Sequence, residues 1–124
     1  MSGHRHLQVK VKEAKGIPAA DSNGKSDPYV VLTINAQKKK TKTIEKTLEP
    51  KWYEEFRFDI DDAKPSVLRL EVFDHDKFSK DDSLGHFELN LKTANIPIGQ
   101  WTSFTRNLLH DKVSGELQFD VLIS

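Results

Sequence analysis

Residues 7–32, LQVKVKEAKGIPAADSNGKSDPYVVL, contain two short runs in which apolar and polar residues alternate. The apolar positions of the two runs are Leu7, Val9, Val11, Val30 and Leu32. An alternation with a period of two is typical of a β-strand with one buried face and one solvated face. Gly24, in the polar segment between the runs, permits a sharp turn. The stretch therefore predicts two strands joined by a loop.

The same alternation recurs along the rest of the chain. Its apolar positions are Phe56, Phe58 and Ile60; Leu68, Leu70 and Val72; Phe87, Leu89 and Leu91; and Leu117, Phe119, Val121 and Ile123. Weaker candidates for strands lie at 40–44 and 100–105, and turn signals such as SNG, AKP and IPIG separate the runs. About eight strands without a long helical pattern predict an all-β fold, either a sandwich or a barrel.

Length and composition narrow the class of protein. The chain has 124 residues, enough for one domain, and no cysteine, which excludes disulfides and thiolate metal sites. No apolar run approaches the roughly 20 residues of a membrane helix, and the N-terminus lacks the apolar segment of a signal peptide. We therefore expect a soluble intracellular protein with a single domain over 1–124, made of a loose N-terminus at 1–5 and a core at 6–124.

Charge is balanced overall but segregated along the chain. There are 19 acidic and 19 basic residues, and a nucleic-acid-binding domain usually shows a basic excess. A basic block, KKKTK, occupies 38–42, and an acidic stretch, DHDKFSKDD, occupies 74–82. This pattern argues against nucleic acid as a partner and indicates a specific charged surface.

Carboxylates gather next to the ends of predicted strands on two loops. They are Asp21, Asp27, Asp74, Asp76 and Asp82, and Ser79 adds a hydroxyl. If both loops lie at one end of the sheet, these oxygens converge. Oxygen ligands favour hard cations, and Ca²⁺ accepts more carboxylates and a more flexible geometry than Mg²⁺ does. An EF-hand is a poor match, because its turn glycine would fall on Ser79 and its last glutamate on Gly85.

Two motifs in this order resemble the C2 domain family. The run at 7–32, with its SDPYV signature, resembles the opening of a C2 domain, and VFDHDKFSKDDSLG at 72–85 resembles its third calcium loop. The resemblance covers essentially the whole chain. It implies an eight-stranded antiparallel β-sandwich that binds two or three Ca²⁺ ions at one end and then docks on membranes. The ligands it implies are Asp21, Asp27, Asp74, Asp76, Ser79 and Asp82, with backbone oxygens near Ser22, His75 and Lys80. Asp81 is the one aspartate of the acidic stretch that it leaves without a role.

The order of the strands refines the resemblance. The chain starts on the strand before the first acidic loop and ends with a further strand, GELQFDVLIS. In the family this arrangement resembles the circularly permuted, phospholipase-like type II topology, which we expect here.

The acidic stretch also carries an aromatic residue, Phe78. Without metal, crowded carboxylates repel an anionic lipid surface, and bound Ca²⁺ would reverse that charge. We expect Phe78 to enter the headgroup region at that point, whereas the alternative is that it folds back onto its loop. Lys77 and Lys80 flank it and either contact lipid phosphates or are simply solvated.

The basic block offers a second candidate lipid site. Lys38, Lys40 and Lys42 are spaced by two, so on a strand they share one face. In the family, KxKTKT resembles the cluster that binds phosphatidylinositol bisphosphate, together with aromatic residues at the positions of Tyr29 and Trp52. The match is incomplete, because Val31 replaces a lysine and EPKWY replaces the usual N-P-x-W-N. The alternative is that the lysines protect an edge strand from pairing.

Together these features predict a calcium-dependent, reversible membrane-targeting module for anionic phospholipid, such as phosphatidylserine or phosphatidylinositol bisphosphate. The alternative is a calcium-binding module for a protein partner. The sequence shows no nucleophile motif and no phosphate-binding glycine loop, so we expect no catalysis. We expect a cytoplasmic monomer that moves to the inner face of the plasma membrane, or to other anionic membranes, when calcium rises.

Overall fold

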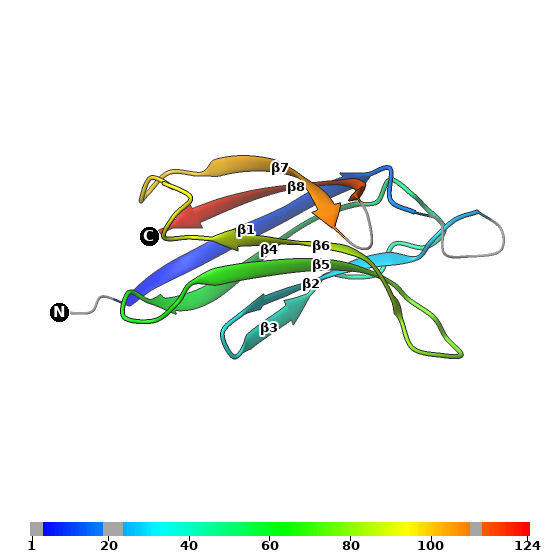
Figure 1. The fold of residues 1–124 in the computed structure, drawn as a ribbon, viewed down its shortest axis with the longest axis horizontal. Coiled ribbons are helices and arrows are strands. Elements are labelled where there is room, and N and C mark those ends of the chain that lie inside the picture. The colour runs from blue at the N-terminus through cyan, green and yellow to red at the C-terminus, as the bar shows by residue number, and fades with distance from the viewer. Residues whose placement is uncertain (1–3, 19–23, 110–112) are drawn as a thin grey trace.

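The computed structural model describes residues 4–18, 24–109 and 113–124, and these form eight β-strands (Figure 1). The strands are β1 (His4–Lys15), β2 (Pro28–Ile34), β3 (Gln37–Lys40), β4 (Lys51–Asp61), β5 (Val67–Asp74), β6 (Asp82–Asn90), β7 (Thr102–Leu109) and β8 (Val113–Ile123). No helix long and apolar enough to cross a membrane occurs in these three segments. The all-β prediction is therefore confirmed.

The strands form two four-stranded antiparallel layers. Along the sheet the order is β3-β2-β5-β6-β7-β8-β1-β4, and among the described residues β6 and β7 are joined by the single pair His86 and Leu109. The first strand therefore lies between β4 and the last strand, β8, as expected for the permuted topology. The layers face each other as a sandwich (Figure 1).

The predicted alternation determines which side chains fill the space between the layers. Strand β2 alternates strictly between buried and half-buried positions, as does β5. Phe58 and Phe119 are the largest fully buried side chains, and the Phe119 ring stacks on that of Phe104 with centroids 5.3 Å apart. Phe56 and Phe87, predicted to be buried, are only partly so and pack against the edge of this core.

Two predicted strands have different bounds in the structure. Strand β3 covers 37–40 rather than 40–44, because Asn35 adopts a left-handed conformation (φ 52°) that closes a tight hairpin directly after β2. The pairing stops where the Thr41 side chain accepts a hydrogen bond from the Val30 N–H at 2.9 Å. Strand β7 likewise covers 102–109 rather than 100–105.

The N-terminal strand starts earlier than the sequence predicts. His4 and Arg5 were expected in a loose segment, yet they pair with Asp61 and Ile60 of β4. Arg5 also places its Nε atom 3.4 Å from a carboxylate oxygen of Asp62. These contacts extend β1 by two residues beyond the predicted core.

The topology gathers three connections at one end of the sandwich. They are the β1–β2, β3–β4 and β5–β6 connections, and the β5–β6 loop extends away from the sandwich at that end (Figure 1). The start of β1 and the end of β8 lie at the opposite end (Figure 1). Both acidic loops of the sequence therefore belong to the same end.

Candidate functional site

Strand pairing brings three of the predicted carboxylates together. Asp74 at the end of β5 pairs with Pro28 at the start of β2, and on its other side with Asp82 at the start of β6. The Asp27 N–H donates to Asp74 Oδ1 at 2.7 Å. Three neighbouring strand ends therefore place Asp27, Asp74 and Asp82 side by side.

Their exposure differs. Asp74 is buried, Asp27 is half-buried and Asp82 is exposed. Asp27 is also held by the chain around it, because its Oδ1 accepts the Lys46 N–H at 2.7 Å and its carbonyl accepts the His75 N–H at 3.0 Å. The half of the site formed by strand ends is therefore fixed by the sheet and the connection after β3.

Asp76 belongs to the loop itself. Its carboxylate accepts the Phe78 N–H and the Ser79 hydroxyl, each at 2.8 Å. The Phe78 N–H, followed by the Ser79 hydroxyl, holds the pKa of Asp76 below its ordinary value. Asp76 is therefore ionised at neutral pH, with its oxygens directed at its own loop.

The apex of this loop is open to solvent. Phe78 is 96% exposed, and Lys77, Ser79 and Lys80 are exposed around it. Almost nothing covers the ring, so the alternative, in which Phe78 folds back onto its loop, does not describe this structure.

The donor set fits a hard cation. Asp27, Asp74, Asp76 and Asp82, with the hydroxyl of Ser79, offer only oxygen. Within the described segments no three His, Asp or Glu side chains are already gathered closely enough to hold a metal ion. The predicted ligands Asp21 and Ser22 lie outside the described residues.

The basic block forms a groove on the adjacent face. The register of β2 and β3 opposes Val31 to Lys40 and Thr33 to Lys38. A hollow of about 420 Å³, here called the lysine groove, is lined by Tyr29, Val31, Lys38, Lys39 and Lys40. The Lys40 ammonium lies 5.9 Å from the centre of the Tyr29 ring. Two of the three predicted lysines and the predicted tyrosine are therefore brought together.

The third lysine, Lys42, does not share their strand. Strand β3 ends at Lys40, and the Lys42 backbone N–H donates instead to a carboxylate oxygen of Glu54 at 2.9 Å. Lys42 therefore lies beyond the end of β3 and does not line the lysine groove, so the expected strand with all three lysines is not formed. Trp52 is buried, and its indole N–H donates to the Pro28 carbonyl at 3.3 Å, so it does not line the lysine groove.

Sequence reasoning missed Asp81. One of its oxygens accepts the hydroxyl of Tyr29. The other accepts the Asp76 N–H at 2.9 Å and lies 3.4 Å from Nδ1 of His75. Burial, and then the bond to Asp81, raise the pKa of Tyr29 to about 12. The bond to Tyr29 is the main cause that lowers the pKa of Asp81. No spacing rule could indicate this pairing, because Tyr29 and Asp81 are 52 positions apart in the sequence.

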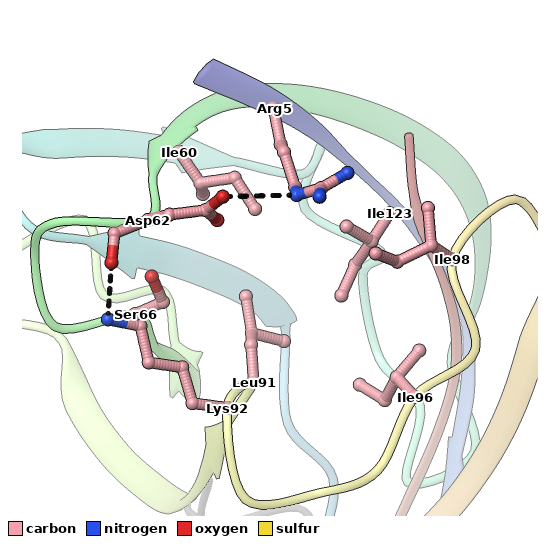
Figure 2. Close-up of a pocket in the computed structure, with 9 residues that line it drawn as sticks. All are labelled: Arg5, Ile60, Asp62, Ser66, Leu91, Lys92, Ile96, Ile98 and Ile123. Carbon is pink, nitrogen blue, oxygen red and sulfur yellow. Dashed lines mark hydrogen bonds and ion pairs between the residues drawn. The ribbon is translucent and has the colours of Figure 1, made fainter. Parts of the chain in front are cut away.

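A further hollow of about 140 Å³ lies at the opposite end of the sandwich (Figure 2). Its lining comprises Arg5, Ile60, Asp62, Ser66, Leu91, Lys92, Ile96, Ile98 and Ile123. Arg5 and Lys92 both hold Asp62, the latter through a 2.8 Å bond to its carbonyl. This hollow is remote from the two acidic loops.

Fold and site together define a β-sandwich binding module with oxygen-rich loops at one end. The profile of the C2 domain matches residues 5–104, and the chain belongs to the C2 domain family. It is 39% identical to mouse (Mus musculus) intersectin-2 over 97% of its own length and 7% of that protein. A single C2 domain of plant extended synaptotagmin 1 superposes with a TM-score of 0.87 at 30% identity, over 96% of this chain and 93% of that one.

A second solved structure carries metal. Extended-synaptotagmin 2, with two C2 domains and bound calcium, superposes with a TM-score of 0.83 at 26% identity. The match covers 95% of this chain and 45% of that one. The chain thus spans a small part of the curated relative and less than half of this longer structure. As a C2 domain it belongs to a class of membrane-targeting and calcium-binding modules.

Proposed function

We propose that this domain binds anionic phospholipid membranes in a calcium-dependent and reversible manner through the β1–β2 and β5–β6 loops. The observation that carries the proposal is the juxtaposition of Asp27, Asp74 and Asp82 on neighbouring strand ends, beside a loop apex with an exposed Phe78. The calcium-bound extended-synaptotagmin 2 structure, which shares the fold, supports it.

The proposed ligands are the loop and strand-end oxygens. Asp74 and Asp82 are positioned by the sheet, and Asp76 and Ser79 by their own loop. To face the cation, Asp76 would exchange its bonds to the Phe78 N–H and the Ser79 hydroxyl for a metal bond. Asp21 and the backbone oxygens of Ser22, His75 and Lys80 complete the proposed ligand set.

The charge of bound Ca²⁺ would switch the membrane affinity of the loop apex. Two bound Ca²⁺ ions would supply about four positive charges beside the loop. At a surface potential of about −30 mV each charge contributes ~0.7 kcal/mol, so the change approaches ~3 kcal/mol. That corresponds to roughly a hundredfold change in membrane affinity. The calcium-bound apex can then contact an anionic membrane that the metal-free carboxylates would repel. Its contacting side chains would be Phe78, Lys77 and Lys80.

The lysine groove would take a phosphorylated inositol headgroup. Lys38 and Lys40 provide charge worth about 1 kcal/mol each near an anionic surface, and Tyr29 forms one wall. Val31, opposite Lys40, contributes no charge. Strand β3 is also the edge of its layer, so protection from strand pairing is a second use of the same lysines.

Vesicle co-sedimentation tests the proposal. Vesicles with and without phosphatidylserine or phosphatidylinositol bisphosphate are mixed with the domain in calcium or in a chelator. We expect sedimentation only with anionic lipid and calcium, and its loss in Asp74→Asn/Asp76→Asn. The matched control, Asp59→Asn/Asp61→Asn, removes two charges at the other end of the sandwich and should bind normally.

Binding that persists in the chelator would refute the calcium dependence. A calcium-induced rise in melting temperature without vesicle binding would instead favour the alternative, a calcium-binding module for a protein partner. We propose further that the domain is a non-catalytic monomer, cytoplasmic until calcium recruits it to the plasma membrane or another anionic membrane.

A further inference from the structure

Tyr29 is shared by the two candidate surfaces. It lines the lysine groove, and with Lys40 it also lines a neighbouring hollow of about 170 Å³, here called the loop pocket. The other residues of the loop pocket are Thr41, Thr43, His75 and Asp81. One aromatic side chain therefore separates the groove from the acidic loop.

The ring of Tyr29 is held on several sides. It stacks on Phe73 with centroids 5.7 Å apart and an interplanar angle of 22°, and it meets the His75 ring edge-on at 6.5 Å. The Lys40 ammonium approaches the ring at 5.9 Å from the groove. The orientation of Tyr29 therefore affects where the charge of Lys40 lies.

The hydroxyl of Tyr29 ties this ring to the loop through Asp81. The same carboxylate accepts the backbone N–H of Asp76, a proposed calcium ligand, at 2.9 Å. Asp82, another proposed ligand, is the next residue in the chain. Asp81 therefore lies between two proposed ligands, and its two oxygens connect the loop with the groove wall: one accepts the Asp76 N–H and the other accepts the Tyr29 hydroxyl.

We propose that Asp81 is a positioning residue that couples cation binding on the β5–β6 loop to binding of a phosphorylated inositol headgroup in the lysine groove, through its hydrogen bond to Tyr29. Fixing Asp76 and Asp82 orders the Asp81 carboxylate, which orders the Tyr29 hydroxyl and the groove wall that includes Lys40. When one ligand has bound, Tyr29 and Lys40 are already ordered for the second. The cation and the headgroup therefore raise each other's affinity by the same factor. This inference rests on the proposed function, since it requires both ligands to bind.

Isothermal titration calorimetry tests the coupling. Calcium affinity is measured with and without soluble inositol trisphosphate, the headgroup probe, and the headgroup affinity with and without calcium. In the wild-type domain we expect each ligand to strengthen the other by about five- to tenfold. Tyr29→Phe retains the ring, its stacking and its contact with Lys40, and loses only the hydroxyl. We expect it to bring the coupling factor close to one.

Asp81→Asn should abolish the coupling as well, and the double variant should be no worse than either single variant. Asp81→Asn also removes a charge near the loop, so its calcium affinity alone falls. Tyr29→Phe keeps that charge and separates the two effects. Melting temperatures without ligand check that each variant is folded, and Asp59→Asn at the other end provides a control of equal charge change.

The outcomes are distinct. If calcium and headgroup both bind the wild-type domain but independently, the coupling is refuted and the proposed function stands. If Tyr29→Phe keeps the wild-type coupling while Asp81→Asn only weakens calcium binding, Asp81 affects calcium only through its negative charge. The inference is then wrong. If the wild-type domain binds no calcium, the proposed function and the coupling fall together. Vesicles containing phosphatidylinositol bisphosphate repeat the comparison with the headgroup in its lipid.

Discussion

Replacing Phe78 by alanine separates membrane contact from folding. The side chain is 96% exposed at the apex of the β5–β6 loop, so its removal takes away almost no contact within the domain. We expect the free energy of unfolding to change by less than about 0.5 kcal/mol. If the ring inserts among lipid headgroups, by contrast, nearly its whole surface is newly removed from water.

The magnitude follows from that exposure. Complete burial of a phenylalanine side chain contributes about 1.5–3 kcal/mol. Because 1.4 kcal/mol corresponds to a factor of ten, Phe78→Ala should weaken calcium-dependent vesicle binding by roughly ten- to a hundredfold. The depth of insertion decides where in this range the value falls.

The assay is vesicle co-sedimentation over a series of lipid concentrations at saturating calcium, with thermal unfolding measured on the same protein. Ile98→Ala is the matched control, because Ile98 is 58% exposed at the other end of the sandwich. Unchanged vesicle affinity in Phe78→Ala would refute insertion. A clearly lower melting temperature would show that the ring packs on the protein instead.

Two further predictions concern Tyr29 and Thr41, which both line the loop pocket. In the Tyr53→Phe variant Tyr29 is the remaining tyrosine, and its ionisation, followed by ultraviolet absorbance, should have a midpoint near pH 12 rather than near 10. Adding Asp81→Asn should lower this midpoint only partly, because burial is the larger cause of the raised pKa. Since the folded-state pKa is raised, the stabilisation from Tyr29 is complete below pH 10 and is lost as the pH rises through about 12; a midpoint near 10 would contradict the bond to Asp81. Thr41→Val leaves the buried Val30 N–H without its side-chain acceptor and should lower the free energy of unfolding by about 1–3 kcal/mol, measured by urea denaturation, whereas Thr43→Val on the exposed side should change it little.

Residues with a periodic signal were readily predicted from the sequence. Val30 and Leu32 alternate with polar or less buried neighbours, and they are buried as expected. The pairing of Asp74 with Asp82 also follows from the sequence, since both border strands that the acidic stretch connects. The family resemblance placed the remaining strands in the same sandwich.

Features set by a single turn or a tertiary contact were not predicted. The left-handed Asn35 makes β3 start earlier than the spacing of the lysines predicted, so β3 ends before Lys42. The role of Asp81 depends on the Tyr29 hydroxyl, and this contact exists only after β2 and β5 have paired. The alternation of apolar and polar residues along the sequence predicts neither the turn at Asn35 nor the contact between Tyr29 and Asp81.

The division of the acidic site between sheet and loop has a consequence for protein engineering. Asp27, Asp74 and Asp82 are spaced by the separation of paired strands, so this half of the site does not depend on the residues at the apex. Residues 77–80 are exposed and form the apex of a loop whose two ends are fixed by paired strands. Replacing Lys77, Phe78 and Lys80 while retaining Asp76, Ser79, Asp81 and Asp82 offers a route to domains with new membrane preferences and an unaltered arrangement of the acidic residues.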